Sequence, residues 1–275
     1  MIQVHVFRKG EELNDVPVAD LSQVRTEPQT LVWVDLVSPT PDELAAMGEE
    51  FQVHELALAS CATGPKQRPR VEEYEGQVLL IAYAAKPVGA GQAVDLHELD
   101  LIAGRNYLLT FHGGAPIDAA EVARRVAARP QLAKHGSGFL LYVALDEVVD
   151  TFFPALDQIG ERIEELEEAV FESTVDVQSQ IFSLRRDLIA IRRVAGPMRD
   201  AMIVLLRATW ACSPGSPSAT CRTSTTTWSG SWRASRTTRI WPRGRWRPAW
   251  PSSPTGSGWS PATSAPTPPS SPWSP

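Results

Sequence analysis

Blocks of apolar and alternating residues in the first 135 positions predict strands and short helices. Five blocks have the length and the pattern of strands: residues 2–7, 31–36, 77–85, 94–102 and 106–111. Gly104 to Asn106 supplies turn residues between the last two of these blocks. That spacing predicts a hairpin made of those two strands.

Three helices are expected in the same region. Ser38 to Glu43 places hydroxyl groups, two prolines and two acids in front of an apolar pattern that reaches residue 51, which is the usual opening of a helix. A second short helix is expected from His54 to Ala62. An amphipathic helix is expected over residues 117–129, where Pro130 ends it.

From about residue 138 the apolar residues recur in alternating steps of three and four. The first run comprises Leu145, Val149, Phe152, Leu156, Ile159, Ile163, Leu166 and Val170, and the second comprises Ile181, Leu184, Leu188, Ile191, Ala195, Met198, Met202 and Leu205. Such a repeat predicts two long helices, the first about 35 residues long. The short break between them makes the pair antiparallel. Pro154 and Pro197 are expected to bend the helices without ending the pattern.

These patterns predict an α+β fold in three parts. Residues 1–135 form a domain of strands and short helices, and residues 136–207 form a long, coiled-coil-like antiparallel helical hairpin. Residues 208–275 form a low-complexity tail, which is expected to be disordered because Ile240 is its only aliphatic side chain larger than alanine.

Composition changes abruptly after Arg207. All 32 acidic residues lie before this point together with 19 basic ones, and the resulting formal charge of −13 disfavours nucleic acid as a partner. The tail holds eight of the nine tryptophans, although disordered segments are poor in aromatic residues. We interpret the tail as out-of-frame translation of a GC-rich gene. A genuine disordered tail and a tryptophan-rich binding segment are the alternatives.

Targeting and redox signals are sparse. Cys61 is the only cysteine before the tail, which fits a reducing compartment without a disulfide framework. The N-terminus has no signal-peptide pattern, and no apolar run reaches the roughly 18 residues of a membrane-spanning helix. We therefore expect no membrane span in this chain.

Polar residues within the predicted strand 94–102 are the first candidate metal site. Asp95, His97, Glu98 and Asp100 are close in sequence. Successive side chains of a strand point to opposite faces, so Asp95 and His97 lie on one face while Glu98 and Asp100 lie on the other. We therefore do not expect these residues to share one ion.

Other candidate catalytic and binding residues have structural explanations. His5, His54, His112 and His135 lack a ligand spacing such as HExxH, and surface or capping roles are expected. Asp35, which could be a catalytic carboxylate, is expected to accept backbone hydrogen bonds at a strand end. No phosphate-binding glycine loop, GxSxG or CxxC motif is present. We therefore expect no enzyme, and assign no catalytic, cofactor-binding or metal-ligating residue.

An acidic run lies in the first long helix and comprises Glu161, Glu164, Glu165, Glu167 and Glu168. Clustered carboxylates attract hydrated Mg²⁺, a hard ion that keeps several of its waters. A solvated helix face without a fixed site is the expected role of this run.

Five segments, in this order, resemble the cytosolic part of the CorA family of magnesium and cobalt transporters. They are WVDL at 33–36, QRPRVEEYEG at 67–76, GRNYLLTFH at 104–112, LLYVALDEVVDTFFPALDQIGERIEELEEAVFE at 140–172 and IFSLRRDLIAIRRVAGPMRDAM at 181–202. The last two are long and fairly specific. One shifted-frame translation of Thr220 to Trp228, YLPDVYDHL, also resembles the family's RDVYDH element at the start of a stalk helix.

The resemblance implies an α/β/α-layered domain on the cytoplasmic side of the cell membrane, followed by an acidic hairpin and a stalk that leads to two membrane helices of a homopentamer. Mg²⁺ would be the transported ion, divalent cations would be the partners, and no bound cofactor is expected. The pore signature Gly-Met-Asn is absent here. We therefore expect this chain by itself to be cytoplasmic and non-conducting.

One departure from the family concerns a regulatory ion. The family often has Leu-Glu-Asp in the short helix before the QRP segment, and its Asp helps to form an intersubunit Mg²⁺ site. The matching residues here are Leu58, Ala59 and Ser60, so ion-dependent gating is in doubt.

The leading hypothesis is a CorA-like divalent cation transport protein that has lost its pore through a frameshift. The alternative is a soluble acidic helical scaffold or regulatory binding protein whose tail is genuine. A cytosolic enzyme is the third possibility. Because the hairpin lacks a third helix, we expect residues 1–207 to associate.

Overall fold

The computed structural model describes eight segments of the chain: residues 1–9, 11–13, 16–17, 20–62, 67–86, 94–130, 136–172 and 177–205. His135 and the tail over residues 208–275 lie outside these segments. The expected disorder of the tail, its out-of-frame origin and the division of the body at residue 136 therefore stay predictions.

A single seven-stranded sheet contains the strands of the described segments, in the order β2-β1-β3-β7-β6-β5-β4. The strands are β1 (Ile2–Arg8), β2 (Glu11–Leu13), β3 (Thr30–Val37), β4 (Arg70–Tyr74), β5 (Gln77–Lys86), β6 (Asp95–Ala103) and β7 (Tyr107–His112). Neighbours are antiparallel except β3 and β7, which run parallel. The five predicted strands are confirmed. Strands β2 and β4 were not predicted, because they lie at the two edges and are largely polar.

The predicted hairpin is the antiparallel pair β6 and β7. Ala103 pairs with Leu108, and the Gly104 N–H donates to the Tyr107 carbonyl at 3.0 Å. A Cβ atom on Gly104 would lie 2.3 Å from a ring carbon of Tyr107, so only glycine fits this turn without a shift of the ring. The turn reverses the chain, so that β7 lies between β6 and β3 in the sheet.

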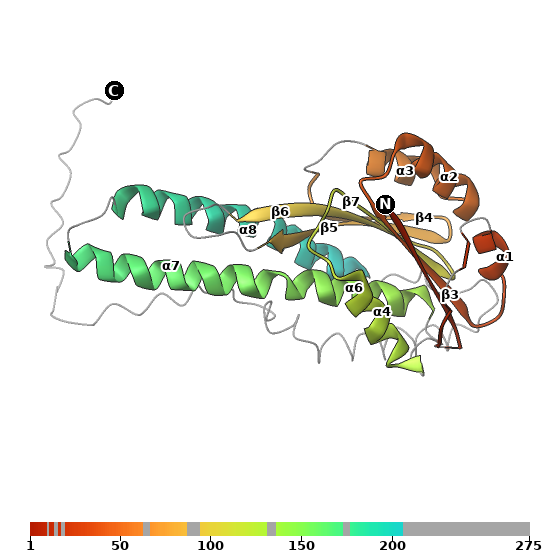
Figure 1. Cartoon of the computed structure of the whole chain (residues 1–275). Coiled ribbons are helices and arrows are strands. Elements are labelled where there is room, and N and C mark those ends of the chain that lie inside the picture. The colour runs from red at the N-terminus through yellow and green to blue at the C-terminus, as the bar shows by residue number, and fades with distance from the viewer. Residues whose placement is uncertain are drawn as a thin grey trace, which may run out of the picture. The chain divides into compact units, whose positions relative to one another are not determined.

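Helices cover both faces of the sheet and confirm the layered α/β/α arrangement (Figure 1). In Figure 1, α2 and α3 lie on one face, and α6, α7 and α8 lie on the other, where they contact strands β4 to β7. The helices of the described segments are α1 (Leu21–Val24), α2 (Pro41–Phe51), α3 (Glu55–Ala62), α4 (Ala119–Ala127), α6 (Ser137–Asp150), α7 (Phe152–Glu172) and α8 (Val177–Leu205).

The predicted first long helix is interrupted at Thr151, so that α6 ends at Asp150 and α7 starts after one residue. The expected continuous helix of about 35 residues is therefore wrong. Pro154 lacks the N–H that would bond to the carbonyl of Asp150, four residues earlier. The Thr151 hydroxyl accepts from the Ala85 N–H at 2.9 Å and donates to the Val148 carbonyl at 2.6 Å. These bonds fix the interruption against β5.

The predicted apolar seam is buried along most of its length. Its buried members are Leu145, Val149, Phe152, Ile159 and Leu166 in α6 and α7, and Leu184, Ile191, Met198, Met202 and Leu205 in α8. Ile163, Ile181 and Leu188 are instead at least 39% exposed. Pro197 lies within α8, which continues past it. The hairpin of α7 and α8 therefore has an apolar side against the sheet and uncovered apolar residues elsewhere.

The start of α2 has the predicted cap. The Glu43 N–H donates to the Thr40 hydroxyl at 3.2 Å, and the Thr40 N–H donates to the Glu43 carboxylate at 2.7 Å, which forms a capping box. We expect Thr40→Ala to lower the free energy of unfolding by about 1 kcal/mol, as measured by urea denaturation. Thr26→Ala, which removes an exposed hydroxyl outside a helix N-terminus, is the control. Equal losses in the two variants would contradict a role for the cap.

Candidate functional site

The acidic run lies on the exposed side of α7. Glu161, Glu164, Glu165, Glu167 and Glu168 are all exposed. Glu161 and Glu164 are each followed by another glutamate four residues later, so like charges are neighbours on the helix surface. Within the described segments, no three His, Cys, Asp or Glu side chains are close enough together to hold a metal ion. The run can attract hydrated cations by charge without providing fixed ligands.

A buried ion pair joins α7 to α8 beside the acidic run. The Arg162 guanidinium donates to the Asp187 carboxylate at 2.6 Å and to the Ser183 hydroxyl at 3.0 Å. The other Asp187 oxygen accepts from the Val94 N–H at 3.2 Å, just before β6. The Asp187 side chain is 2% exposed and that of Arg162 is 12% exposed. One carboxylate therefore connects both hairpin helices to the sheet.

The polar residues of β6 separate onto two faces, as predicted. Asp95 and His97 bond to each other at 2.8 Å on an exposed part of the strand. Glu98 instead accepts from the Tyr83 hydroxyl at 2.6 Å and from the Gln67 N–H at 2.7 Å. Asp100 is buried and hydrogen-bonds to the Cys61 thiol of α3. The predicted placement of these residues on two faces is confirmed, and the absence of a shared ion stays a prediction.

The pair of Cys61 and Asp100 has unusual electrostatics. Burial, and then the neighbouring Glu98 charge, raises the pKa of Asp100 to about 7. Burial, and then Asp100, raises the pKa of the Cys61 thiol. Asp100 Oδ1 is buried without a hydrogen-bond partner among the described residues. Burial therefore disfavours the ionised form of the Asp100 carboxyl. It also keeps the Cys61 thiol in its protonated, unreactive form.

Asp35 and His112 meet at the carboxyl ends of the parallel strands β3 and β7. Asp35 accepts from the Thr110 hydroxyl and lies 3.2 Å from His112 Nε2. His112 Nδ1 accepts the N–H groups of Gly114 and Ala115 at 3.1 and 2.9 Å, so the ring hydrogen is assigned to Nε2, which donates to Asp35. The backbone-acceptor role expected for Asp35 is wrong, because its described partners are side chains.

A cavity of about 540 Å³ lies beside this pair and is lined also by the residues that lead into α4. Asp35 and His112 are 5% and 8% exposed. Both ring nitrogens of His112 are engaged, so the ring is held as a structural connector between β7 and the following loop. His112 has a structural role, but its ring is buried and binds the loop after β7, where a surface position or a helix cap was expected.

The two remaining described histidines also have structural partners. His5 bonds to Glu12 at 2.7 Å and stacks on Trp33. His54 Nδ1 accepts from the Leu56 N–H at 3.2 Å at the start of α3, and its ring stacks on Tyr74. The surface and capping roles predicted for them are confirmed.

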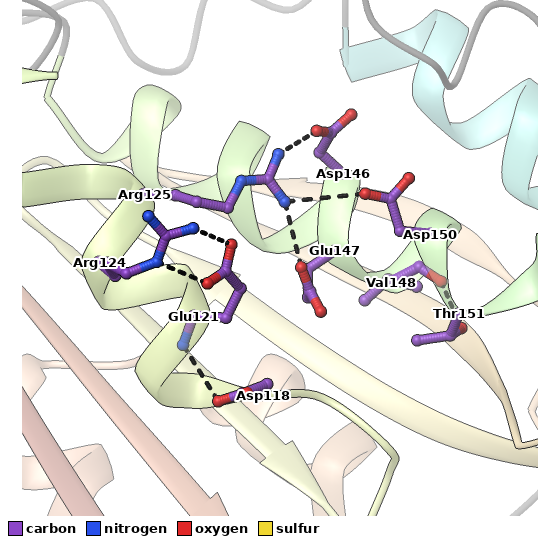
Figure 2. A network of polar contacts seen from close by, with 9 residues as sticks. All are labelled: Asp118, Glu121, Arg124, Arg125, Asp146, Glu147, Val148, Asp150 and Thr151. Atoms are coloured by element: carbon purple, nitrogen blue, oxygen red, sulfur yellow. Dashed lines mark hydrogen bonds and ion pairs between the residues drawn. The ribbon is translucent and has the colours of Figure 1, made fainter. Parts of the chain in front are cut away.

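One arginine meets three carboxylates in a cluster that was not predicted from the sequence (Figure 2). Arg125 of α4 pairs with Asp146, with Glu147 at 3.1 Å and with Asp150 at 3.9 Å, all on α6. Burial raises the pKa of Glu147, and the Arg125 charge opposes that shift. The spacing of three and four residues places the carboxylates on one face of α6. The cluster attaches α4 to α6. No sequence pattern around Arg125 predicts that this arginine binds the carboxylates of α6.

None of the helices in the described part of the chain combines the length and the apolar character that a membrane crossing requires.

A model of the family described as "CorA-like Mg2+ transporter protein" matches residues 28–214. The chain belongs to the CorA family. The Bacillus subtilis "Putative metal ion transporter YfjQ" is 31% identical over 175 residues, which are 63% of this chain and 53% of that protein. The Thermotoga maritima "Cobalt/magnesium transport protein CorA" is 26% identical over 202 residues, which are 72% of this chain and 57% of that protein. The chain thus spans about half the length of these curated relatives.

Solved structures agree on the CorA fold. The soluble domain of CorA from Methanocaldococcus jannaschii has a TM-score of 0.56 and 20% identity, and the match covers 86% of this chain and 91% of that one. The cytoplasmic domain of ZntB from Vibrio parahaemolyticus also has a TM-score of 0.56, with 14% identity, over 86% of this chain and 90% of that one. The α+β fold predicted from the sequence is confirmed.

Of the α3 residues that depart from the CorA pattern, Ser60 makes hydrogen bonds to nearby groups. The Ser60 hydroxyl donates to the Leu56 carbonyl at 3.1 Å, and the Ser60 carbonyl accepts from the Gln67 side chain at 2.7 Å. The Ala59 side chain has no group that can bind a metal. Ser60 therefore fastens α3 to the QRP segment, and neither position supplies a carboxylate.

Proposed function

We propose that the described residues form the cytoplasmic domain of a protein that transports Mg²⁺ or Co²⁺ across the cell membrane. The observation that carries this proposal is the match of the CorA-like family model over residues 28–214. The name of the Thermotoga maritima relative, a cobalt/magnesium transport protein, supports the choice of ions. The similarity to the soluble domain of CorA and to the cytoplasmic domain of ZntB supports the location.

The domain would act in a homo-oligomer, with five copies in the family that it resembles. Divalent cations would be cargo and ligands, without a resident cofactor and without enzymatic chemistry. The exposed carboxylates of α7 would raise the local concentration of hydrated cations. With Ala59 and Ser60 in α3, we propose no fixed regulatory ion at that helix.

We further propose that a lost base placed the tail in the wrong frame and that the chain as given does not conduct ions. The abrupt change of composition after Arg207 supports this, as does a family match that ends at residue 214. Resequencing codons 200–225 of the gene tests the proposal. A missing base in a run of G is expected, and an error-free read of the present frame would contradict it.

Transport itself is tested with the restored gene. One base is inserted in that run, the product is reconstituted in liposomes, and uptake of Mg²⁺ and Co²⁺ is followed with a fluorescent indicator. Uptake driven by a negative internal potential is expected. The chain as given, in the same liposomes, is the matched control. A restored product that carries neither ion would contradict the transport proposal.

A further inference from the structure

The cavity beside Asp35 lies where the chain leaves two parallel strands in different directions. Among the described strands, β3 and β7 are the only parallel neighbours, and the ends of both line this cavity. The chain passes from β3 to α2 on one face of the sheet, and from β7 to α4, which packs on α6 of the other face (Figure 1). In open sheets with parallel strands, ligands bind in the crevice at such a topological switch point.

The size and the lining of this β3–β7 cavity suit a small organic molecule. Its volume of about 540 Å³ is within the range of small-molecule sites, roughly 300–1,000 Å³. Apolar side chains of Val37, Pro116 and Ile117 line it together with the polar side chains of Asp35 and Asp118. A lining of this kind accepts a ligand that has an apolar body and a charged or polar end.

The sign of the charge in the cavity favours a cation. Among the described residues that line it, Asp35 and Asp118 are carboxylates, and none is a lysine or an arginine. The Met1 ammonium also lies at the cavity, but it donates to the Val37 carbonyl at 2.8 Å. The N-terminus of α4 could attract an anion. The Asp118 carboxylate already caps that helix end, because it accepts from the Glu121 N–H at 3.0 Å.

The Asp35 carboxylate is held in place and can accept further hydrogen bonds. It accepts from the Thr110 hydroxyl, and its Oδ1 lies 3.2 Å from His112 Nε2. The Trp33 indole N–H donates to the Thr110 oxygen at 3.1 Å, which leaves the hydroxyl hydrogen for Asp35. A carboxylate can accept about four hydrogen bonds. A ligand cation would therefore find an oriented acceptor that is only 5% exposed.

We propose that the β3–β7 cavity binds an aliphatic primary amine in its ammonium form. The ammonium group donates hydrogen bonds to Asp35. The alkyl chain lies against Val37, Pro116 and Ile117. This ligand class goes beyond the proposed function and does not depend on ion transport.

Two other classes of cation fit the cavity less well. A quaternary ammonium ion has no N–H to donate to Asp35, and no Phe, Tyr or Trp side chain is among the described lining residues to provide an aromatic face. A bare metal ion needs several ligands. No three His, Cys, Asp or Glu side chains in the described part of the chain are close enough together to supply them.

Isothermal titration calorimetry of the full chain with n-butylamine tests the proposal near neutral pH. Binding to one site per chain is expected. Tetramethylammonium and inorganic phosphate, titrated at the same ionic strength, are expected not to compete with the amine. Mg²⁺ is also expected not to displace it. If any of these three ions occupies the cavity in place of butylamine, the proposed ligand class is wrong.

Charge-removing variants locate the binding site. Asp35→Asn is expected to raise the Kd for butylamine roughly tenfold or more, because it removes a charge-assisted hydrogen bond. Asp118→Asn keeps a good helix N-cap and removes an exposed charge, so a rise of about two- to fivefold is expected. Asp157→Asn removes an exposed carboxylate from α7. It is the matched control and is expected to leave the Kd unchanged.

A blocking variant makes the test independent of the packing around Asp35. Ala120 lines the cavity from an exposed position in the first turn of α4. Ala120→Phe is therefore expected to abolish butylamine binding without loss of thermal stability. A wild-type chain that does not bind butylamine, or an unchanged Kd in folded Asp35→Asn or Ala120→Phe, would overturn the proposal. Each of these results leaves the transport proposal standing.

Discussion

Replacement of Asp187 by alanine is expected to lower the free energy of unfolding by about 3–5 kcal/mol. The Asp187 carboxylate is 2% exposed and is bonded to the Arg162 guanidinium at 2.6 Å and to the Val94 N–H at 3.2 Å. Its removal leaves a buried guanidinium without its counter-charge and a backbone N–H without its acceptor. Urea denaturation followed by circular dichroism measures the loss.

The exposed pair of Arg199 and Asp200 provides the control for this prediction. The side chain of Asp200 is 64% exposed, so Asp200→Ala is expected to change the stability by less than about 0.5 kcal/mol. The double variant Arg162→Met with Asp187→Leu is expected to regain most of the lost stability, because apolar side chains of similar volume need no counter-charge. Equal effects of Asp187→Ala and Asp200→Ala would show that the buried pair has no special role.

Replacement of Asp100 by asparagine is expected to stabilise the protein at neutral and alkaline pH. Burial, and then Glu98, raises the pKa of Asp100 to about 7 from its usual 3.8. The folded state therefore binds this proton more tightly than the unfolded state does. Between about pH 4 and 7 the contribution of Asp100 to stability falls as the pH rises, and above about pH 7 it stays constant. The difference between the two pKa values corresponds to at most about 4 kcal/mol.

The measurement is the stability of Asp100→Asn minus that of the wild type, from urea denaturation at several values between about pH 5 and 8. The difference is expected to grow with pH up to about 7 and to reach roughly 2–4 kcal/mol. Asp95→Asn removes a half-exposed carboxyl from the same strand, and it is the matched control. A difference that does not vary with pH would refute the raised pKa of Asp100.

The features that were predicted correctly depend on residues close together in the sequence, such as strand alternation and helix caps. The alternation in β6 placed Asp95 and Glu98 on opposite faces, and the residues around Thr40 predicted the cap of α2. Edge strand β4 was missed because its sequence, RVEEY, is mostly polar. Pro154 signalled a bend, but the interruption at Thr151 also depends on a bond to β5 that no local pattern contains.

The polar pairs were not predictable because their partners are far apart in the sequence. Asp35 and His112 are separated by 77 residues, and they meet only because β3 and β7 are neighbours in the sheet. Arg125 and Asp146 are separated by 21 residues and depend on how α4 packs on α6. The acidic run of α7 could be predicted from the sequence, since helix spacing alone places its glutamates on one side of the helix.

The single parallel ladder between β3 and β7 has a consequence for how the chain folds. On one side of it, β1 pairs with β2 and β3, and on the other, β4 to β7 form a meander, so each half is built from strands close in sequence. The β3–β7 ladder joins residues about 75 apart and must close a much longer loop. We therefore expect the strands within each half to pair first. Formation of the β3–β7 ladder between the two halves is then expected to limit the folding rate.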